Sequence, residues 1–252
     1  MRLTRLVRWS ALSAGFVILA SFSSSPAQPQ KKRQASQKKQ NTAMATARRL
    51  MTPGPRPKKA PLPPSRVPLE VIQGERIAFV GNGTAERMND YGYFETYLHL
   101  RFPDKDLVVR NFARPADEVA RRQRPNDYTR LDDPLYAFNP DTMLCFFGLN
   151  ESYKGPNSVE QFKIDYEKFL DDYARKYPRD DTGSPPRFVL VTPTAIEFTG
   201  NPYWPEGTKE NANLKLYSEA VKAVGAKRHL AVIDLFDPTY ETFSRNRGRH
   251  ET

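Results

Sequence analysis

Cysteine and histidine are scarce in this 252-residue chain, and their scarcity excludes two kinds of site. The single cysteine, Cys145, has no partner within the chain for a disulfide, and its place in TMLCFFG favours a small buried hydrophobic side chain. The three histidines, His99, His229 and His250, lie far apart and show no metal-ligand spacing. We therefore expect no bound metal and no cofactor.

Glycine is missing where a nucleotide site would need it. In FVGNGTAERM, residues 79–88, two glycines follow an apolar run, but Glu86 stands where a dinucleotide-binding loop needs a third glycine. No lysine followed by serine or threonine closes the loop, as a P-loop requires. The segment therefore does not predict a phosphate-binding turn.

Acidic residues are absent from the first part of the chain. Met1 to Leu69 contains fourteen lysines and arginines and no aspartate or glutamate. The remainder carries 25 of the 39 basic residues and all 29 acidic ones, so it is mildly acidic although the whole chain has a net charge of +10. A groove that neutralises phosphates needs basic residues on the folded domain. We therefore expect no nucleic-acid partner.

No apolar run reaches the length of a membrane-spanning helix. The longest, Trp9 to Phe22, has fourteen residues, whereas a span usually needs about 18 or more. Three arginines precede it, and Ser25-Pro26-Ala27 follows as a small-residue cleavage site. This pattern predicts a signal peptide over residues 1–27 and a secreted or periplasmic protein. An uncleaved membrane anchor is the alternative interpretation.

Residues 28–69 are rich in proline and positive charge. Seven prolines fall between Pro53 and Pro68, and eleven lysines and arginines lie between residues 28 and 68. Such a segment buries too little apolar surface to fold alone, so we predict a basic, disordered linker over residues 28–69. Its charge suits contact with an anionic envelope surface, and it equally suits a solvated spacer.

From Glu70 onward, short apolar runs alternate with helical periodicity. The predicted strands are residues 76–80, 107–112, 142–147, 187–192 and 230–236, and the predicted helices are residues 91–102, 116–122, 159–177 and 211–224. Nearly continuous apolar strands that alternate with helices are typical of a parallel sheet covered on both faces. In such sheets, ligands bind beyond the carboxyl ends of the strands. The sequence thus predicts an α/β domain over residues 70–252 with its site in the loops after the strands.

Three of these loops resemble a known family. The ordered blocks FVGN, RNFARPADEV and CFFGLNES are similar to those of SGNH hydrolases, the GDSL-type esterases and lipases, in a secreted bacterial branch with a Gly-x-Asn-Glu third block. The resemblance covers about residues 70 to 237. It implies a flavodoxin-like three-layer α/β/α sandwich with about five parallel strands. It also implies hydrolysis of an ester in a carbohydrate or acyl substrate.

The resemblance also implies a role for particular positions. Gly83 stands where the family has its nucleophilic serine, within Gly81-Asn82-Gly83, so the position has no side chain to attack with. Ala116 stands where a second-block glycine offers its amide to the oxyanion, and Asn150 matches the oxyanion asparagine. An equally open interpretation is that Asn150 ties the loop backbone. Thr84, one position later, is a poor substitute for the serine because it would point in a different direction.

The family's base block is also missing. No Asp-x-x-His occurs in the chain, and the sequence ends at Thr252, about where that block and a closing helix are expected. His250 does not match, because Arg247 precedes it by three positions. The resemblance therefore predicts a domain that is incomplete at its carboxyl end, with lost or very weak esterase activity, or a fragment of a larger secreted protein.

Other side chains are expected on the rim of the same site. Glu151 is a candidate acid or base there, or a solvent-facing carboxylate. Tyr203 and Trp204, with Phe198, suit stacking on a sugar or acyl group, and they equally suit covering a sheet edge. The candidate contacts for an ester-bearing or glycan ligand are Asn82, Thr84, Glu151, Tyr203 and Trp204. The alternative function is a non-catalytic carbohydrate- or envelope-binding module or scaffold, and the sequence carries no signal for the oligomeric state.

Overall fold

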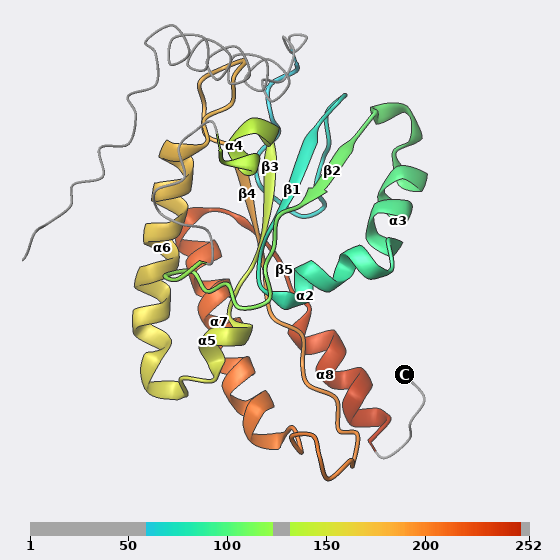
Figure 1. Ribbon diagram of the computed structural model, residues 1–252, viewed down its shortest axis with the longest axis vertical. Helices are drawn as coiled ribbons and strands as arrows, with labels where there is room; N and C mark the ends of the chain where they lie inside the picture. Colours follow the sequence, from blue (N-terminus) through green and yellow to red (C-terminus); the bar gives the residue numbers. More distant parts are fainter. Residues whose placement is uncertain (1–58, 123–131, 248–252) are drawn as a thin grey trace, which may run out of the picture. The chain divides into compact units, whose positions relative to one another are not determined.

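The computed structural model describes residues 59–122 and 132–247, which are built around a five-stranded, all-parallel sheet (Figure 1). The strand order is β2-β1-β3-β4-β5, and all four pairs are parallel. The strands are β1 (Arg76–Gly81), β2 (Val108–Asn111), β3 (Thr142–Phe146), β4 (Arg187–Val191) and β5 (Ala231–Ile233). The predicted fold class and all five predicted strands are confirmed.

Burial of the strands agrees with their sequences. Every residue of β3, the central strand, and of its neighbour β4 is buried, as their continuous apolar runs require. β2, at one edge, alternates between exposed and buried residues at Val108, Val109 and Arg110. Hydrophobic side chains therefore lie on both faces of the sheet, so each face needs a helical layer to shield it from water.

Two helical layers cover the sheet (Figure 1). On one face, α6 (Val159–Lys176) and α7 (Thr208–Arg228) bury a set of aromatic residues, namely Phe162, Tyr166, Phe169, Tyr173 and Tyr217. On the other face, α2 (Gly83–Glu86), the 3-10 helix η1 (Arg87–Asp90) and α3 (Tyr93–Arg101) contribute Ala85, Met88, Phe94 and Leu98. The aromatic residues that recur with helical spacing along α6 and α7 are thus part of the core.

The shorter elements connect these layers. They are η2 (Pro103–Lys105), α4 (Pro134–Phe138), α5 (Leu149–Ser152) and η3 (Pro156–Ser158). A closing helix is also present, because α8 (Phe236–Arg245) follows β5 directly, contrary to the prediction that the sequence ends before one. β5 stops at Ile233, short of its predicted end at residue 236, and α8 begins at Phe236, whose N donates to the Asp234 carboxylate at 3.0 Å.

The folded unit begins before Glu70, so the predicted linker boundary is wrong. Lys59 Nζ lies 2.5 Å from Asp141 Oδ2, and the Ser65 hydroxyl donates to Phe188 O at 2.5 Å and accepts from Ala231 N at 2.9 Å. Residues 59–69 therefore run along the amino-terminal edge of the sheet. The high proline content indicated a linker. The segment is nevertheless held in place, by side-chain bonds to residues of and next to distant strands and not by an apolar core of its own.

Among residues 59–122 and 132–247, no helix is long and apolar enough to cross a membrane. The predicted signal peptide and most of the basic segment lie outside the described residues, as does His250.

Candidate active site at the carboxyl edge of the sheet

The first corner of the site follows β1. Gly81 has φ 132°, and a Cβ there would lie 2.1 Å from Phe146 O, so only glycine fits. Asn82 is 1% exposed, and its Oδ1 accepts from Thr84 N at 3.0 Å, which caps α2. The predicted ligand contact Asn82 is therefore a buried helix cap.

Gly83 begins α2 with room for a side chain. A Cβ built there would meet Pro115 Cα at 3.5 Å and Pro115 O at 3.7 Å, which are ordinary van der Waals contacts. The half-buried Thr84 hydroxyl makes no hydrogen bond to any residue in the described ranges. The corner thus has space for a nucleophile, but residue 83 provides no atom for one.

The segment after β2 is a series of turns, so the predicted helix over residues 116–122 is wrong. Arg114 N donates to Gly81 O at 2.9 Å, Asp117 N to Arg114 O at 3.1 Å, and Glu118 N to Arg121 O at 2.8 Å. Ala116 is exposed in the first turn, and its amide has no partner among the described residues. This amide remains available to an incoming oxygen atom.

Asn150 holds that segment in place. Its Nδ2 donates to Pro115 O at 3.1 Å and to Asp117 O at 2.9 Å. A side-chain amide has two N–H donors, so both are committed to the loop backbone. This geometry favours the loop-tying interpretation of Asn150, because donation to an oxyanion would require breaking one of these bonds.

Glu151 is buried, contrary to the interpretation as a solvent-facing carboxylate. The residue is 3% exposed, and its two oxygens accept from Val119 N at 2.8 Å and from Gly148 N at 2.9 Å. Burial raises the pKa of the Glu151 carboxyl, and the charge of Glu118 adds to the rise, although the backbone N–H groups oppose it. Glu151 and Asn150 together join the loops after β2 and β3, which explains why residues 116–122 do not form a helix.

The end of β5 supplies acidic residues and no histidine. Asp234 Oδ1 accepts from the Thr192 hydroxyl at 3.0 Å, and Lys222 Nζ lies 2.8 Å from Asp234 Oδ2 and 2.9 Å from Asp237 Oδ2. Although partial burial opposes it, hydrogen bonds from Lys222 and Thr192 hold the pKa of Asp234 below its usual value. Asp234-Leu235-Phe236-Asp237 has the spacing of Asp-x-x-His with aspartate in the last position, a pattern that a search for histidine does not find.

The two described histidines lie elsewhere. His99 is on α3, 3.8 Å from Glu95, and His229 follows α7 at the amino end of β5. Neither lies in a loop at the carboxyl edge of the sheet. No group of three or more histidine, cysteine, aspartate or glutamate residues in the described ranges could hold a metal ion.

The aromatic loop after β4 divides into a buried part and an exposed part. Phe198 is buried, with the Arg247 guanidinium 4.6 Å from its ring centre. Tyr203 and Trp204 are 93% and 66% exposed. The two exposed rings therefore contribute little to the core and are free to meet a ligand.

Comparison with known proteins supports the fold and gives no closer relationship. No protein-family model matches the chain, and no curated protein sequence matches it. A gut microbial diltiazem-metabolizing enzyme matches with a TM-score of 0.52 and 19% identity over 76% of this chain, which spans 43% of that enzyme. A protein described as a GDSL-like lipase from Parabacteroides merdae matches with a TM-score of 0.51 and 15% identity over 71% of this chain and 85% of that one. The similarity to these structures is one of fold.

Proposed function

We propose that this chain is an SGNH-hydrolase-like domain in which esterase activity is lost or very weak. The observation that carries the proposal is Gly83 at the corner after β1, where a side chain would fit and none exists. Acyl transfer through a covalent intermediate needs a nucleophile, a base and oxyanion donors. Asn150 supports the proposal, since both of its donors already bind carbonyl oxygens of the second loop.

Hydrolysis of p-nitrophenyl acetate by the full chain tests this proposal. We expect no release of p-nitrophenolate above the buffer rate. Turnover by the unaltered protein that Thr84→Ala abolishes would contradict the proposal, because Thr84 would then be the nucleophile.

Two double variants test whether the rest of the site supports ester hydrolysis once a nucleophile and a histidine are supplied. Gly83→Ser with Asp237→His places an Asp-x-x-His sequence after β5 and a hydroxyl at the first corner. The serine oxygen would attack the acetyl carbonyl, p-nitrophenolate would leave, the histidine would take the serine proton, and water would then release acetate. We expect a burst of p-nitrophenolate from this variant and none from Gly83→Ala with Asp237→His, which adds the same Cβ without the hydroxyl.

A second candidate function is non-catalytic binding of a glycan or envelope fragment, and the exposure of Tyr203 and Trp204 favours it. Trp204→Ala should weaken such binding, whereas Tyr153→Ala, which removes an aromatic ring that is 67% exposed elsewhere, should not. Unchanged binding in Trp204→Ala would remove this loop from consideration.

Export and envelope contact through the basic segment belong to the same proposal. N-terminal sequencing of protein from expressing cells tests export, because cleavage after Ala27 leaves a chain that begins at Gln28. A mature chain that keeps Met1 would oppose it.

A further inference from the structure

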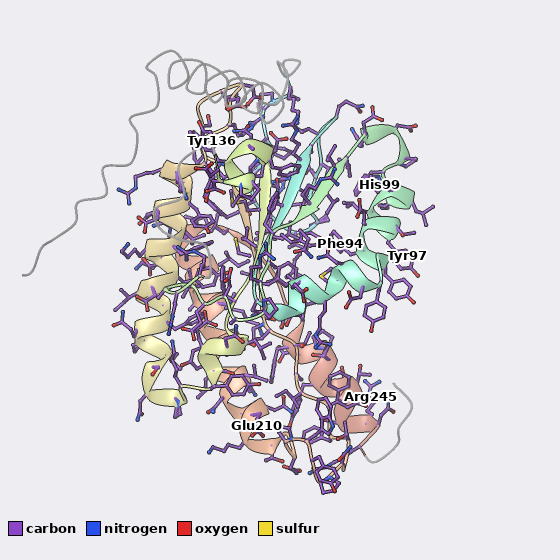
Figure 2. The ribbon with its side chains drawn as sticks, in the orientation of Figure 1. Phe94, Tyr97, His99, Tyr136, Glu210 and Arg245 are labelled. Atoms are coloured by element: carbon purple, nitrogen blue, oxygen red, sulfur yellow. The ribbon has the colours of Figure 1, made fainter. Side chains whose placement is uncertain are left out.

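Exposed large hydrophobic side chains lie on the outer side of α3 and in the turn before it. Tyr91, Tyr93, Tyr97 and Leu100 are 67% to 70% exposed. The opposite side of the helix holds it to the sheet through Phe94, whose ring packs edge-on against Phe79 at 5.1 Å. Figure 2 shows Phe94 directed toward the sheet and Tyr97 on the other side of α3. Phe94 and Leu98 pack partly buried against the sheet, whereas the exposed rings add no contact to the core.

Two of these rings form a fixed pair. The rings of Tyr91 and Tyr93 lie 6.0 Å apart, and their planes differ by 2°. Gly92 between them has φ 62°, a conformation that suits glycine, and its amide donates to Met88 O at 3.2 Å. Thr96 N and the Thr96 hydroxyl both donate to Gly92 O, at 3.0 and 2.9 Å. These bonds fix the turn, so the backbone presents the two rings from defined positions.

A pocket of about 280 Å³ opens at the same turn, between α3 and the edge strand β2. Gly92 lines it, the apolar part of its wall includes Phe79, Phe94 and Val109, and polar groups come from Asn89, Glu95 and Arg110. The volume lies just below the roughly 300 to 1,000 Å³ usual for small-molecule sites, which suits one small ring.

Asn111 also lines the pocket, but its amide already bonds Ala85 O and Ala113 N. The two charged side chains of the pocket, Arg110 and Glu95, are opposite in sign and have few bonds of their own. Arg110 has no carboxylate within ion-pair distance among the described residues, and its guanidinium donates only to Val109 O, at 3.4 Å. The Glu95 carboxylate lies 3.8 Å from His99 Nε2. A guanidinium and a carboxylate in one pocket cancel each other's charge and together offer donors and acceptors. Such a pair favours a neutral ligand whose groups both donate and accept hydrogen bonds.

We propose that this pocket and the Tyr91–Tyr93 pair bind a neutral oligosaccharide, with one sugar ring in the pocket and adjoining rings against the tyrosines. Aromatic faces pack on the apolar faces of sugar rings, while vicinal hydroxyls can bond the donors of Arg110 and the acceptors of Glu95. The pocket lies beside β2, and neither Gly83 nor Trp204 lines it. It stands whether or not the chain hydrolyses esters.

Affinity electrophoresis of the full chain tests the proposal, with hydroxyethylcellulose, arabinoxylan and galactomannan as neutral probes in the gel. We expect at least one probe to retard the protein. Tyr93→Ala and Arg110→Ala should each weaken that binding about tenfold. The matched control Tyr153→Ala removes an equally exposed tyrosine from the loop after α5 and should bind as the unaltered chain does.

Four results would overturn the proposal. The first is an absence of retardation by all three neutral polysaccharides. The second is retardation that Trp204→Ala abolishes and Tyr93→Ala leaves unchanged, which assigns binding to the loop after β4. The third is a concentration-dependent dimer that Tyr93→Ala dissociates, because a second copy of the chain would then cover the rings. Retardation by polygalacturonate alone also opposes the proposal, since the basic residues before Glu70 would explain it.

Discussion

At the amino-terminal edge of the sheet the buried charged side chains pair with one another, whereas at the carboxyl edge Asn82, Asn150 and Glu151 bind loop backbone. Glu75, Asp141, Arg179 and Arg187 are each at most 6% exposed, and salt bridges join them as Arg187–Glu75 and Arg179–Asp141. At the other edge, Asn150 and Glu151 contact backbone atoms only. Paired charges stabilise the amino-terminal edge against unfolding. At the carboxyl edge the polar groups hold the loop backbone, and they would have to give up those bonds to act on a ligand.

The largest expected effect comes from breaking the amino-terminal network at Arg187. Its guanidinium bonds Glu75 Oε1 at 2.7 Å, the Thr142 hydroxyl at 3.0 Å and Glu70 O at 2.9 Å. Removing one partner of a buried ion pair leaves the other charge uncompensated, so Arg187→Ala should lower the free energy of unfolding by about 3 to 5 kcal/mol. Urea unfolding measures this loss.

Arg175→Ala is the matched control, because Arg175 pairs with Asp172 at an exposed position and should cost less than about 1 kcal/mol. If the two variants unfold at the same urea concentration, the contrast between a buried and an exposed pair fails. Arg187→Met with Glu75→Leu sharpens the test, since removal of both charges should recover much of the loss.

At the carboxyl edge, Glu151 should matter most. Glu151→Ala leaves the amides of Val119 and Gly148 without their acceptor, and we expect a loss of about 2 to 3 kcal/mol in the free energy of unfolding. Hydrogen exchange should also quicken at these two amides. Glu118→Ala, which removes the neighbouring partly exposed carboxylate, is the control. An unchanged exchange rate at Val119 would show that Glu151 does not hold the second loop.

The sequence predicts the sheet well, because strands that are buried on both faces appear in the sequence as nearly continuous apolar runs. It predicts α6 equally well, since Phe162, Tyr166 and Phe169 recur with helical spacing. The failures have a common cause in partners that are far apart along the chain. Lys59 meets Asp141 across 82 positions, and Glu151 meets Val119 across 32. Composition and the spacing of neighbouring residues do not indicate such bonds. They therefore predicted a linker over residues 59–69 and a helix over residues 116–122.

A smaller effect is expected at the segment before β1. The Lys59 side chain is only 6% exposed, and Lys59→Ala removes its bond to the buried Asp141 carboxylate. Asp141 keeps its bonds to Arg179 and to Arg76 N. The expected loss is about 1.5 to 3 kcal/mol, the usual contribution of a hydrogen bond to a charged group. Limited proteolysis should then cleave between residues 59 and 70. Arg66→Ala is the control because its pair with Glu70 is exposed, and equal protection in both variants would argue that Lys59 does not hold this segment.

The smallest effect concerns pH and Asp133, which begins α4 at the amino-terminal side of the domain. Its burial would raise the pKa of the carboxyl, but hydrogen bonds from Lys176 and Tyr177 outweigh burial and lower it. A lowered folded-state pKa contributes stability above the unfolded value of about 3.9, and this contribution is lost as pH falls through the folded-state pKa. Asp133→Asn keeps a side chain suited to the helix cap but cannot ionise. The difference in urea midpoint between the two proteins should therefore be present at pH 7 and shrink below about pH 4, and a difference that grows on acidification would show that the carboxyl is stabilised in its protonated form.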